Sequence, residues 1–214
     1  MRGNARVVMI LGAARLLSEQ GLEGTSFAHV LGETGAPRGS LYHHFPGGKR
    51  ELVAEAVRYA GSLLDKGLGT AASDDPAEVM SAFTALWRRL LADSGLTAGC
   101  AVAAVAIGAP QDHELAAVTS EVFEHWSDLL ADHLRRTGIT DPTARDLAVT
   151  AIAAVEGALI LSRASQDLRP IDAVTGQLRQ LARLAGQQAA ETSVADRDPR
   201  RAGTADGTAP RPAS

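Results

Sequence analysis

Two short helical segments joined by a glycine turn lie near the start of the chain, and they constrain its fold more than any other feature. Residues 24–45 read GTSFAHVLGETGAPRGSLYHHF. Thr25 or Ser26 can cap a first helix, because a hydroxyl accepts hydrogen bonds from the unpaired N–H groups at a helix start. Gly35 ends that helix, since glycine adopts a positive φ without a steric penalty. The pattern is typical of a helix-turn-helix motif.

The second helix of this pair is short, and most of its side chains are predicted to be exposed. Pro37 suits the first turn of a helix. Leu41 and Phe45 are four residues apart, so they share one face and can anchor the helix to a core. The other side chains are small, polar or basic, as the major groove of DNA requires; they belong to Arg38, Gly39, Ser40, Tyr42, His43 and His44.

These residues closely resemble the DNA-binding domain of the TetR family of repressors. The resemblance rests on the pair TS at 25–26, on the run GAPRGSLYHHF at 35–45, and on Lys49 and Leu52. The sequence FPGGK at 45–49 is similar to the LmrA/YxaF-like branch, which contains lincomycin- and flavonoid-responsive regulators. The stretch GCAVAAV at 99–105 resembles the same branch more weakly.

The sequence departs from the usual family pattern at three positions near the turn. Leu31 and Thr34 stand where the family usually has alanine, and Ala36 stands where it usually has valine. We therefore expect the contact between the two helices to be repacked, with the fold retained.

Different members of this motif are expected to contact DNA in different ways. Arg38 is the strongest candidate for reading a base, because a guanidinium can make paired hydrogen bonds to guanine. Ser40 can reach a base edge or a phosphate, and Gly39 allows close approach. His44 is either a contact or a surface imidazole. The resemblance implies that a further set positions the protein on the DNA backbone, consisting of Thr25, Ser26, Tyr42, His43 and Lys49.

The rest of the chain is divided by glycine and proline into helical segments, with no competing strand pattern. The sequence predicts an all-α protein of about nine helices, near residues 4–20, 26–33, 37–44, 48–67, 76–93, 100–108, 112–136, 142–167 and 171–188. We expect a three-helix bundle with the helix-turn-helix over residues 1–47 and an effector-binding and dimerisation domain over 48–190. Residues 191–214 almost lack large apolar side chains, so a disordered tail is expected there.

Charge and cysteine content narrow the class of protein further. The formal net charge is −4, yet residues 1–60 carry seven Lys and Arg against five Asp and Glu. Only the front of the chain is therefore suited to phosphates. The single cysteine, Cys100, leaves no internal disulfide and is typical of a reducing compartment, so a cytoplasmic location is expected. The apolar stretch 147–161 is interrupted by Glu156 and is shorter than a membrane span, so no transmembrane segment is expected.

Apolar and aromatic residues behind the DNA-binding unit are sufficient to line a small-molecule cavity. The resemblance implies an effector pocket in this region, whereas the aromatic pattern alone favours a filled core. Glu156 either hydrogen-bonds a ligand or forms an internal salt bridge or cap, because a lone buried charge is costly. Cys100 is either an inert buried thiol or a redox sensor. The predicted lining consists of Met80, Phe83, Trp87, Cys100, Val105, Phe123, Trp126 and Glu156.

The last two helices have the pattern of an interface between subunits. Their spacing of three and four residues favours helix packing, and small residues allow a close approach. The resemblance implies a four-helix bundle between two copies, which would present two recognition helices to a palindromic operator. Packing within one chain is the alternative. The residues concerned are Ile171, Val174, Leu178, Leu181 and Ala185 on one helix and Ala153, Ala154, Gly157 and Ala158 on the other.

We therefore expect a ligand-responsive repressor that binds double-stranded DNA as a homodimer, with no cofactor and no catalysis. Neighbouring His43 and His44 diverge on a helix and lack a completing ligand, so no metal site is expected. His113-Glu114 lacks the second histidine of a zinc-protease motif, and Gly48-Lys49 lacks the rest of a phosphate loop. The alternatives are an activator, a regulator without an effector, and an all-α carrier or enzyme with a vestigial DNA-binding motif.

Overall fold

The computed structural model describes residues 2–68 and 73–196, apart from the side chains of residues 2–4, 40 and 193–196. This described part contains nine α-helices and no strand, which confirms the predicted all-α fold. The helices are α1 (Arg2–Gly24), α2 (Phe27–Thr34), α3 (Arg38–His44), α4 (Lys49–Leu68), α5 (Pro76–Asp93), α6 (Ala101–Gly108), α7 (His113–Arg136), α8 (Thr143–Ser165) and α9 (Arg169–Asp196).

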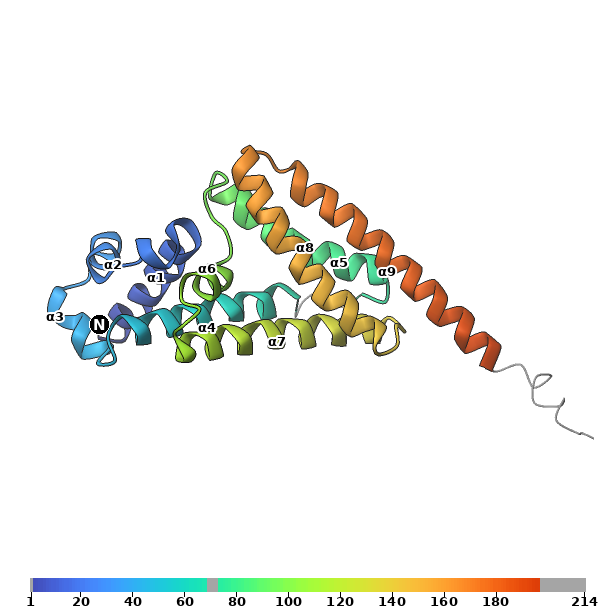
Figure 1. Cartoon of the computed structure of the whole chain (residues 1–214), viewed down its shortest axis with the longest axis horizontal. Helices are drawn as coiled ribbons and strands as arrows, with labels where there is room; N and C mark the ends of the chain where they lie inside the picture. The colour runs from blue at the N-terminus through green and yellow to red at the C-terminus, as the bar shows by residue number, and fades with distance from the viewer. Residues whose placement is uncertain (1, 69–72, 197–214) are drawn as a thin grey trace, which may run out of the picture.

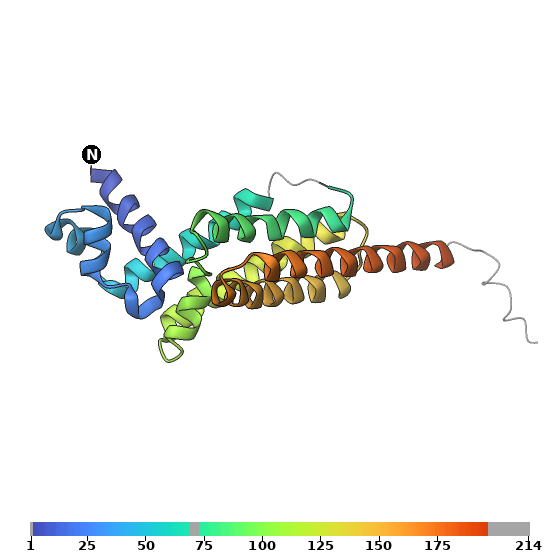
Figure 2. The ribbon, with the colours of Figure 1, turned by 90° about the horizontal axis from the view of Figure 1, so that it is seen from above.

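The helices form an elongated molecule with the helix-turn-helix at one end (Figure 1). Helices α1, α2 and α3 lie together at that end, and α4 leads away from them alongside α7. Helix α6 packs on α1, which joins the front bundle to the rest of the chain. Seen from above, α5, α8 and α9 form the opposite part of the molecule (Figure 2).

The core of the front bundle, formed by α1, α2 and α3, contains the two apolar residues that the sequence predicts as anchors of α3. Leu41 and Phe45 are 1 % and 0 % exposed, which confirms that they fix α3 to the core. The unusual Thr34 is accommodated by Gly12 on α1, where a Cβ atom would lie only 2.5 Å from the Thr34 Cγ2 methyl. The Thr34 hydroxyl donates to the Val30 carbonyl at 2.6 Å. The altered turn is therefore repacked against α1.

Helices α4 and α7 are in close contact halfway along their length. A Cβ atom at Gly61 would lie 2.8 Å from Val122 Cγ1, so this position leaves no room for a side chain. Beside it, the buried Trp126 indole N–H donates to the Gly61 carbonyl at 2.9 Å. The Trp126 ring also meets Trp87 of α5 edge to face, with ring centres 5.4 Å apart. Trp126 thus links α4, α5 and α7.

Helix α9 extends beyond the predicted 171–188 at both ends. Pro170 does not separate α8 from α9 but lies in the first turn of α9, where a missing N–H costs nothing. The carboxyl end continues to Asp196, over residues rich in alanine and glutamine that favour a helix even with little packing. The first six residues of the expected tail are thus helical, and residues 197–214 lie outside the described part.

Three residues of the predicted α9 stripe pack within the chain, so for these three the assignment to a subunit interface is wrong. Ile171, Leu178 and Ala185 are buried, and α9 packs on α5 and α8. Helix α5 is apolar over a wide arc and covers this stripe. Leu181 of the predicted stripe remains exposed, as do Leu184 on α9 and Val149, Ile160 and Leu161 on α8.

Helix α8 is longer than the apolar stretch that the sequence suggested. It has 23 residues, and an 18-residue window within it has a mean hydropathy of 1.6, so by length and composition it could cross a membrane. The apolar stretch 147–161 itself is shorter than a span, and α8 extends it at both ends with polar and charged residues. Because α8 packs between α7 and α9 and has a buried face, its composition also fits a core helix with one apolar exposed side.

Candidate nucleic-acid interface and adjoining cavity

Helix α2 and the turn after it are fixed by local hydrogen bonds. The Ser26 hydroxyl accepts from the His29 N–H at 3.1 Å and caps the helix. Gly35 has φ 64°, and its N–H donates to the Leu31 carbonyl at 2.9 Å. Thr25 is buried, and its hydroxyl donates to the Gly21 carbonyl at 2.8 Å. The predicted contacts Thr25 and Ser26 are therefore already used in folding the motif.

Helix α3 presents its polar side to solvent. Arg38, Gly39 and His43 are exposed, and Arg38 is in no ion pair among the described residues. Tyr42 is 71 % exposed, with its ring edge to face on Phe27 at 5.8 Å between centres. His44 is half-buried. The side chain of Ser40 lies outside the described part.

Lys49 connects the start of α4 to the end of α1. Its ammonium group donates to the Leu22 carbonyl at 3.0 Å, although the residue as a whole is exposed. One hydrogen bond to a carbonyl leaves two donors of the ammonium group for other acceptors. A phosphate contact at this position is therefore compatible with the bond to Leu22.

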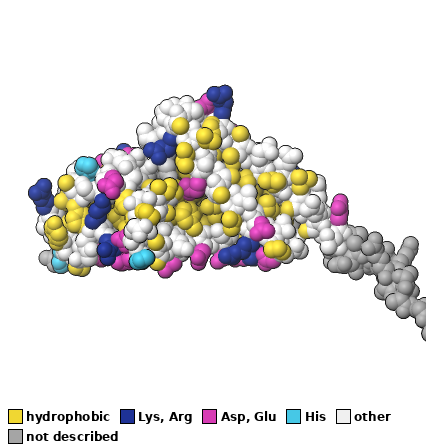
Figure 3. All heavy atoms as spheres, viewed as in Figure 1, with side chains coloured by type: hydrophobic (Ala, Val, Ile, Leu, Met, Phe, Trp, Pro, Cys, Tyr) yellow, Lys and Arg dark blue, Asp and Glu magenta, His cyan; other side chains and the backbone are white. Residues whose placement is uncertain are grey.

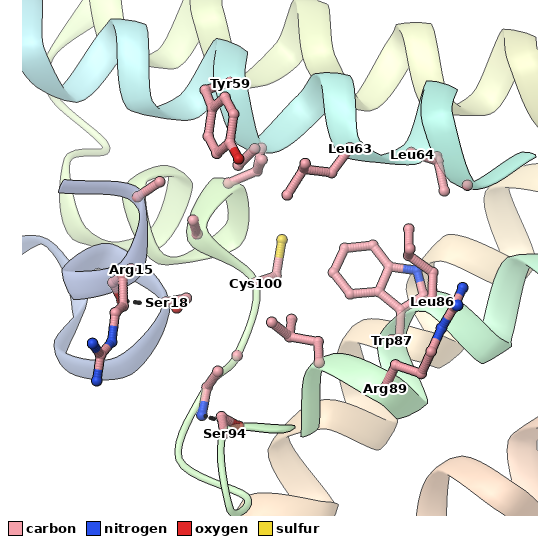
Figure 4. Close-up of a pocket in the computed structure, with 18 of the residues that line it drawn as sticks. Arg15, Ser18, Tyr59, Leu63, Leu64, Leu86, Trp87, Arg89, Ser94 and Cys100 are labelled. Atoms are coloured by element: carbon pink, nitrogen blue, oxygen red, sulfur yellow. Dashed lines mark hydrogen bonds between the residues drawn. The ribbon is translucent and has the colours of Figure 1, made fainter. Parts of the chain in front are cut away.

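A cavity of about 870 Å³ lies between the front bundle and the rest of the chain. Figure 4 shows the Cys100 thiol, the Trp87 ring and Leu63 directed toward the same space. Its wall is mainly apolar, with charged residues at the edges. The lining includes Leu11, Ala14, Arg15, Ser18 and Glu19 from α1, Tyr59, Leu63, Leu64 and Lys66 from α4, Leu86, Trp87, Arg89 and Leu90 from α5, and Cys100, Val102 and Trp126.

Three of the predicted lining residues border this cavity and five do not. Trp87, Cys100 and Trp126 are part of its wall. The other five lie elsewhere: the side chains of Met80, Phe83 and Val105 are buried in the core, Phe123 packs against Trp126, and Glu156 lies behind Cys100.

Sequence reasoning missed the contribution of α1 to the cavity wall. The core of the front bundle uses one stripe of α1, and Leu11, Ala14 and Ser18 form a second stripe at helical spacing. This second stripe is the sequence feature from which the contribution of α1 could have been predicted. The cavity thus touches the DNA-binding unit directly.

The buried Cys100 thiol at the edge of the cavity is paired with the partly buried Glu156 behind it. Burial, together with the nearby carboxylate of Glu156, raises the pKa of the Cys100 thiol well above its usual value. Burial also raises the pKa of Glu156, while its hydrogen bond with the Cys100 thiol acts in the opposite direction. Glu156 Oε1 has no hydrogen-bond partner among the described residues, and no ion pair of this part includes Glu156. The thiol is therefore held in its neutral, weakly reactive form.

Comparison with protein families supports the reading of both parts of the chain. Residues 10–56 match the model for bacterial regulatory proteins of the tetR family. Residues 76–177 match the model described as transcriptional regulator LmrA/YxaF-like, C-terminal domain. An uncharacterized HTH-type transcriptional regulator of Mycobacterium tuberculosis is 40 % identical over 179 residues, which cover 81 % of this chain and 91 % of that protein. The chain belongs to the TetR family of transcriptional regulators.

Other TetR-family proteins extend the similarity over most of the chain. The HTH-type transcriptional regulator LmrA of Bacillus subtilis is 30 % identical over 178 residues, covering 79 % of this chain and 92 % of LmrA. A crystal structure of regulatory protein TetR from Rhodobacter sphaeroides has the same fold, with a TM-score of 0.74 at 21 % identity. It covers 83 % of this chain and 98 % of that one. As a TetR-family regulator, this protein binds DNA through its helix-turn-helix and regulates transcription.

Proposed function

We propose that this TetR-family protein is a cytoplasmic homodimeric repressor whose DNA binding is released by a small apolar molecule. Helix α3 reads a palindromic operator, with Arg38 and Ser40 at base edges. Tyr42, His43, His44 and Lys49 contact the DNA backbone, and Thr25 and Ser26 position the motif. The predicted pocket residues that border the cavity, Trp87, Cys100 and Trp126, contact the ligand.

The observation that carries this proposal is the position of the cavity. It has an apolar wall of a size suited to a small organic molecule. One side of that wall is α1, which also packs against α2 and α3. A molecule that enters the cavity therefore touches the same helix that supports the DNA-reading surface.

The exposed apolar residues of α8 and α9 support a dimer through these helices. Figure 3 shows hydrophobic side chains gathered over the region of α8 and α9. Ile160 and Leu161 are 63 % and 60 % exposed. Exposed apolar residues on two neighbouring helices are typical of a covered surface, and a twofold axis there places two copies of α3 on one face of DNA.

The proposed mechanism is a shift between two conformations. The ligand binds more tightly to a conformation in which α4 and α1 move the two copies of α3 away from adjacent major grooves. The population of DNA-binding dimer then falls, and it falls further the larger the ratio of the ligand's affinities for the two conformations. A ligand with equal affinity for both conformations would leave DNA binding unchanged.

Binding of the protein to DNA from the region upstream of its own gene tests this proposal. Fluorescence anisotropy at two salt concentrations should show sequence preference for wild type and a loss of that preference for Arg38→Ala. Arg136→Ala, an exposed arginine at the end of α7, is the matched control and should bind like wild type. The absence of any sequence preference in wild type would overturn the regulator proposal. A panel of aromatic compounds that failed to release DNA would overturn its ligand-dependent part.

A further inference from the structure

The carboxyl end of α1 is held by groups from outside the DNA-binding unit. Gly21 has φ 72° and ψ −174°, so the regular helix is interrupted there. Carbonyls in the turn before such a break need donors from elsewhere. The Gly99 N–H, in the segment before α6, donates to the Ser18 carbonyl at 2.7 Å. Arg163, near the end of α8, donates to the Glu19 carbonyl at 3.2 Å.

The two donors are in contact with each other. A Cβ atom built on Gly99 would lie 2.9 Å from Arg163 Nη1 and 3.6 Å from the Ser18 carbonyl oxygen. The absence of a side chain at residue 99 thus leaves the space that the guanidinium occupies. No ion pair within the described residues includes Arg163. Its positive charge lies at the carboxyl end of α1, where the helix dipole favours a cation.

The same segment forms part of the cavity wall. Ser18, Gly99 and Cys100 all line the cavity, so the bond between Gly99 and Ser18 lies at its edge. In Figure 4 the chain through Cys100 runs between α1, which carries Ser18, and α5, which carries Trp87. A molecule in the cavity would therefore press on the segment that holds α1.

We infer that Gly99 and Arg163 are positioning residues for DNA binding. They cap α1 from the ligand-binding domain and so set the orientation of the helix-turn-helix. Displacement of this cap is the step by which occupancy of the cavity weakens DNA binding. This inference rests on the proposed function, because it concerns how α1 is held in the state that binds DNA.

Two substitutions remove the Arg163 contact of the cap, one by deleting the donor and the other by displacing it. Arg163→Met removes the donor and keeps the apolar stem. Gly99→Ala displaces the guanidinium, which is the far end of a flexible side chain, so the fold should tolerate it. Each variant should bind the upstream DNA about three- to tenfold more weakly than wild type, a range typical of coupling between sites. The double variant should bind no more weakly than the weaker-binding single variant, because both changes remove the same contact.

Controls separate positioning from general stability. Arg145→Met removes another exposed arginine of α8, which pairs with Asp128 on α7 and forms no hydrogen bond or ion pair with α1 among the described residues. This variant should bind like wild type. Arg163→Lys restores a donor and should recover at least half of the lost affinity. The melting temperatures of Gly99→Ala and Arg163→Met should stay close to that of wild type, since Arg163 is exposed.

The outcomes distinguish this inference from the proposed function. If wild type shows no sequence-preferred binding, the proposed function fails and the inference fails with it. If wild type binds with sequence preference and both single variants bind as tightly as wild type, the cap has no role in DNA binding and the proposed function stands. Additive losses in the double variant, or losses that follow a fall in melting temperature, would also overturn the inference.

Discussion

Single glycines decide how closely the helices of this TetR-family regulator approach one another. Gly12 leaves the space that the Thr34 methyl group fills between α1 and α2, and Gly61 does the same for Val122 between α4 and α7. In both places a Cβ atom would lie within 3 Å of the opposing side chain. Neither glycine has a positive φ, so each is required for space and not for backbone conformation.

The pair formed by Gly12 and Thr34 gives the first prediction. Gly12→Ala should lower the free energy of unfolding by about 1–3 kcal/mol, because it overpacks the contact between α1 and α2. Thr34→Ser removes the methyl group and keeps the hydroxyl that bonds to Val30. In a Thr34→Ser background, Gly12→Ala should cost markedly less. Urea denaturation measures both effects, and an equal cost in the two backgrounds would contradict the packing explanation.

The buried carboxyl group of Glu156 gives a prediction of pH dependence. Its pKa is raised in the folded protein, chiefly by burial, so ionisation at neutral pH costs stability. The contribution of Glu156 to the free energy of unfolding should therefore fall as the pH rises from about 4.5 through the folded pKa. Glu156→Gln removes the charge and should raise the free energy of unfolding by about 1 kcal/mol at pH 7.5.

The measurement is urea denaturation of Glu156→Gln and wild type at several pH values. The difference between them should shrink as the pH is lowered toward 4.5, where the wild-type carboxyl group becomes protonated. A difference that stays constant with pH, or a less stable variant at pH 7.5, would show that Glu156 is not an uncompensated charge.

At the scale of the helices, α4 is attached differently at its start and at its middle. Near its start, the exposed Arg50 pairs with Asp112 and Glu114 at the beginning of α7, each at 3.1 Å. At its middle, the buried Trp126 hydrogen bond joins α7 to the Gly61 carbonyl. Exposed ion pairs contribute little, whereas a buried hydrogen bond is costly to break. The middle of α4 is therefore its fixed point.

The two contacting tryptophans allow a matched test of this point. Trp126→Phe leaves an aromatic ring but removes the donor to Gly61, whereas Trp87 Nε1 has no hydrogen-bond partner among the described residues. Trp126→Phe should therefore cost about 1–2 kcal/mol more stability than Trp87→Phe. Urea denaturation of the two variants makes the comparison. Equal losses would mean that ring packing, and not the hydrogen bond, joins α4 to α7.

The helices themselves were largely predictable because their boundaries depend on local chemistry. Apart from the carboxyl end of α9, the boundaries of all nine described helices were expected within a few residues, since caps, glycines and prolines act over one or two turns. The end of α9 was missed because alanine and glutamine sustain a helix without the apolar pattern that sequence reasoning follows. For α3, the spacing of Leu41 and Phe45 was sufficient to identify the buried side.

At the scale of the whole molecule, the described chain leaves one apolar surface on α8 and α9 without cover. Val149 and Ile160 on α8, and Leu181 and Leu184 on α9, are between 43 % and 63 % exposed. A different side of α9, which carries Ile171, Leu178 and Ala185, is buried where α9 packs on α5 and α8. This division of α9 into two apolar sides could not be read from its 3-4 spacing, because the same spacing serves packing within a chain and between chains.

Charged substitutions on this surface should separate the subunits of the proposed dimer. Ile160→Glu and Leu184→Glu should each shift the protein from dimer to monomer in light scattering and weaken DNA binding at least tenfold, since one copy of α3 would then bind alone. Ile107→Glu is the matched control, because Ile107 is 75 % exposed and lies on α6, away from this surface. A monomeric wild type, or a control that also dissociates, would contradict the assignment.

The cavity was only partly predictable, for a related reason. The family resemblance pointed to a pocket here, and Trp87, Cys100 and Trp126 of the proposed lining border the cavity. Periodicity, however, states which residues are apolar and not which helix they face. Met80 and Phe83 follow the same pattern and belong to the core. The contribution of α1 depends on how α1, α4 and α6 meet in space, which one-dimensional spacing does not contain.

If the proposed effector response is correct, the shared use of α1 limits how ligand specificity can be redesigned or can diverge. Changing Leu11, Ala14 or Ser18 to suit a new ligand would also alter the helix on which α2 and α3 rest. Helix α5 does not support α2 and α3 in this way, so Leu86 and Leu90 are the safer positions for a change of ligand specificity. Libraries confined to the α5 side should yield responses to new ligands with the operator unchanged. Changes on the α1 side that improve binding of a new ligand should also alter binding of the operator.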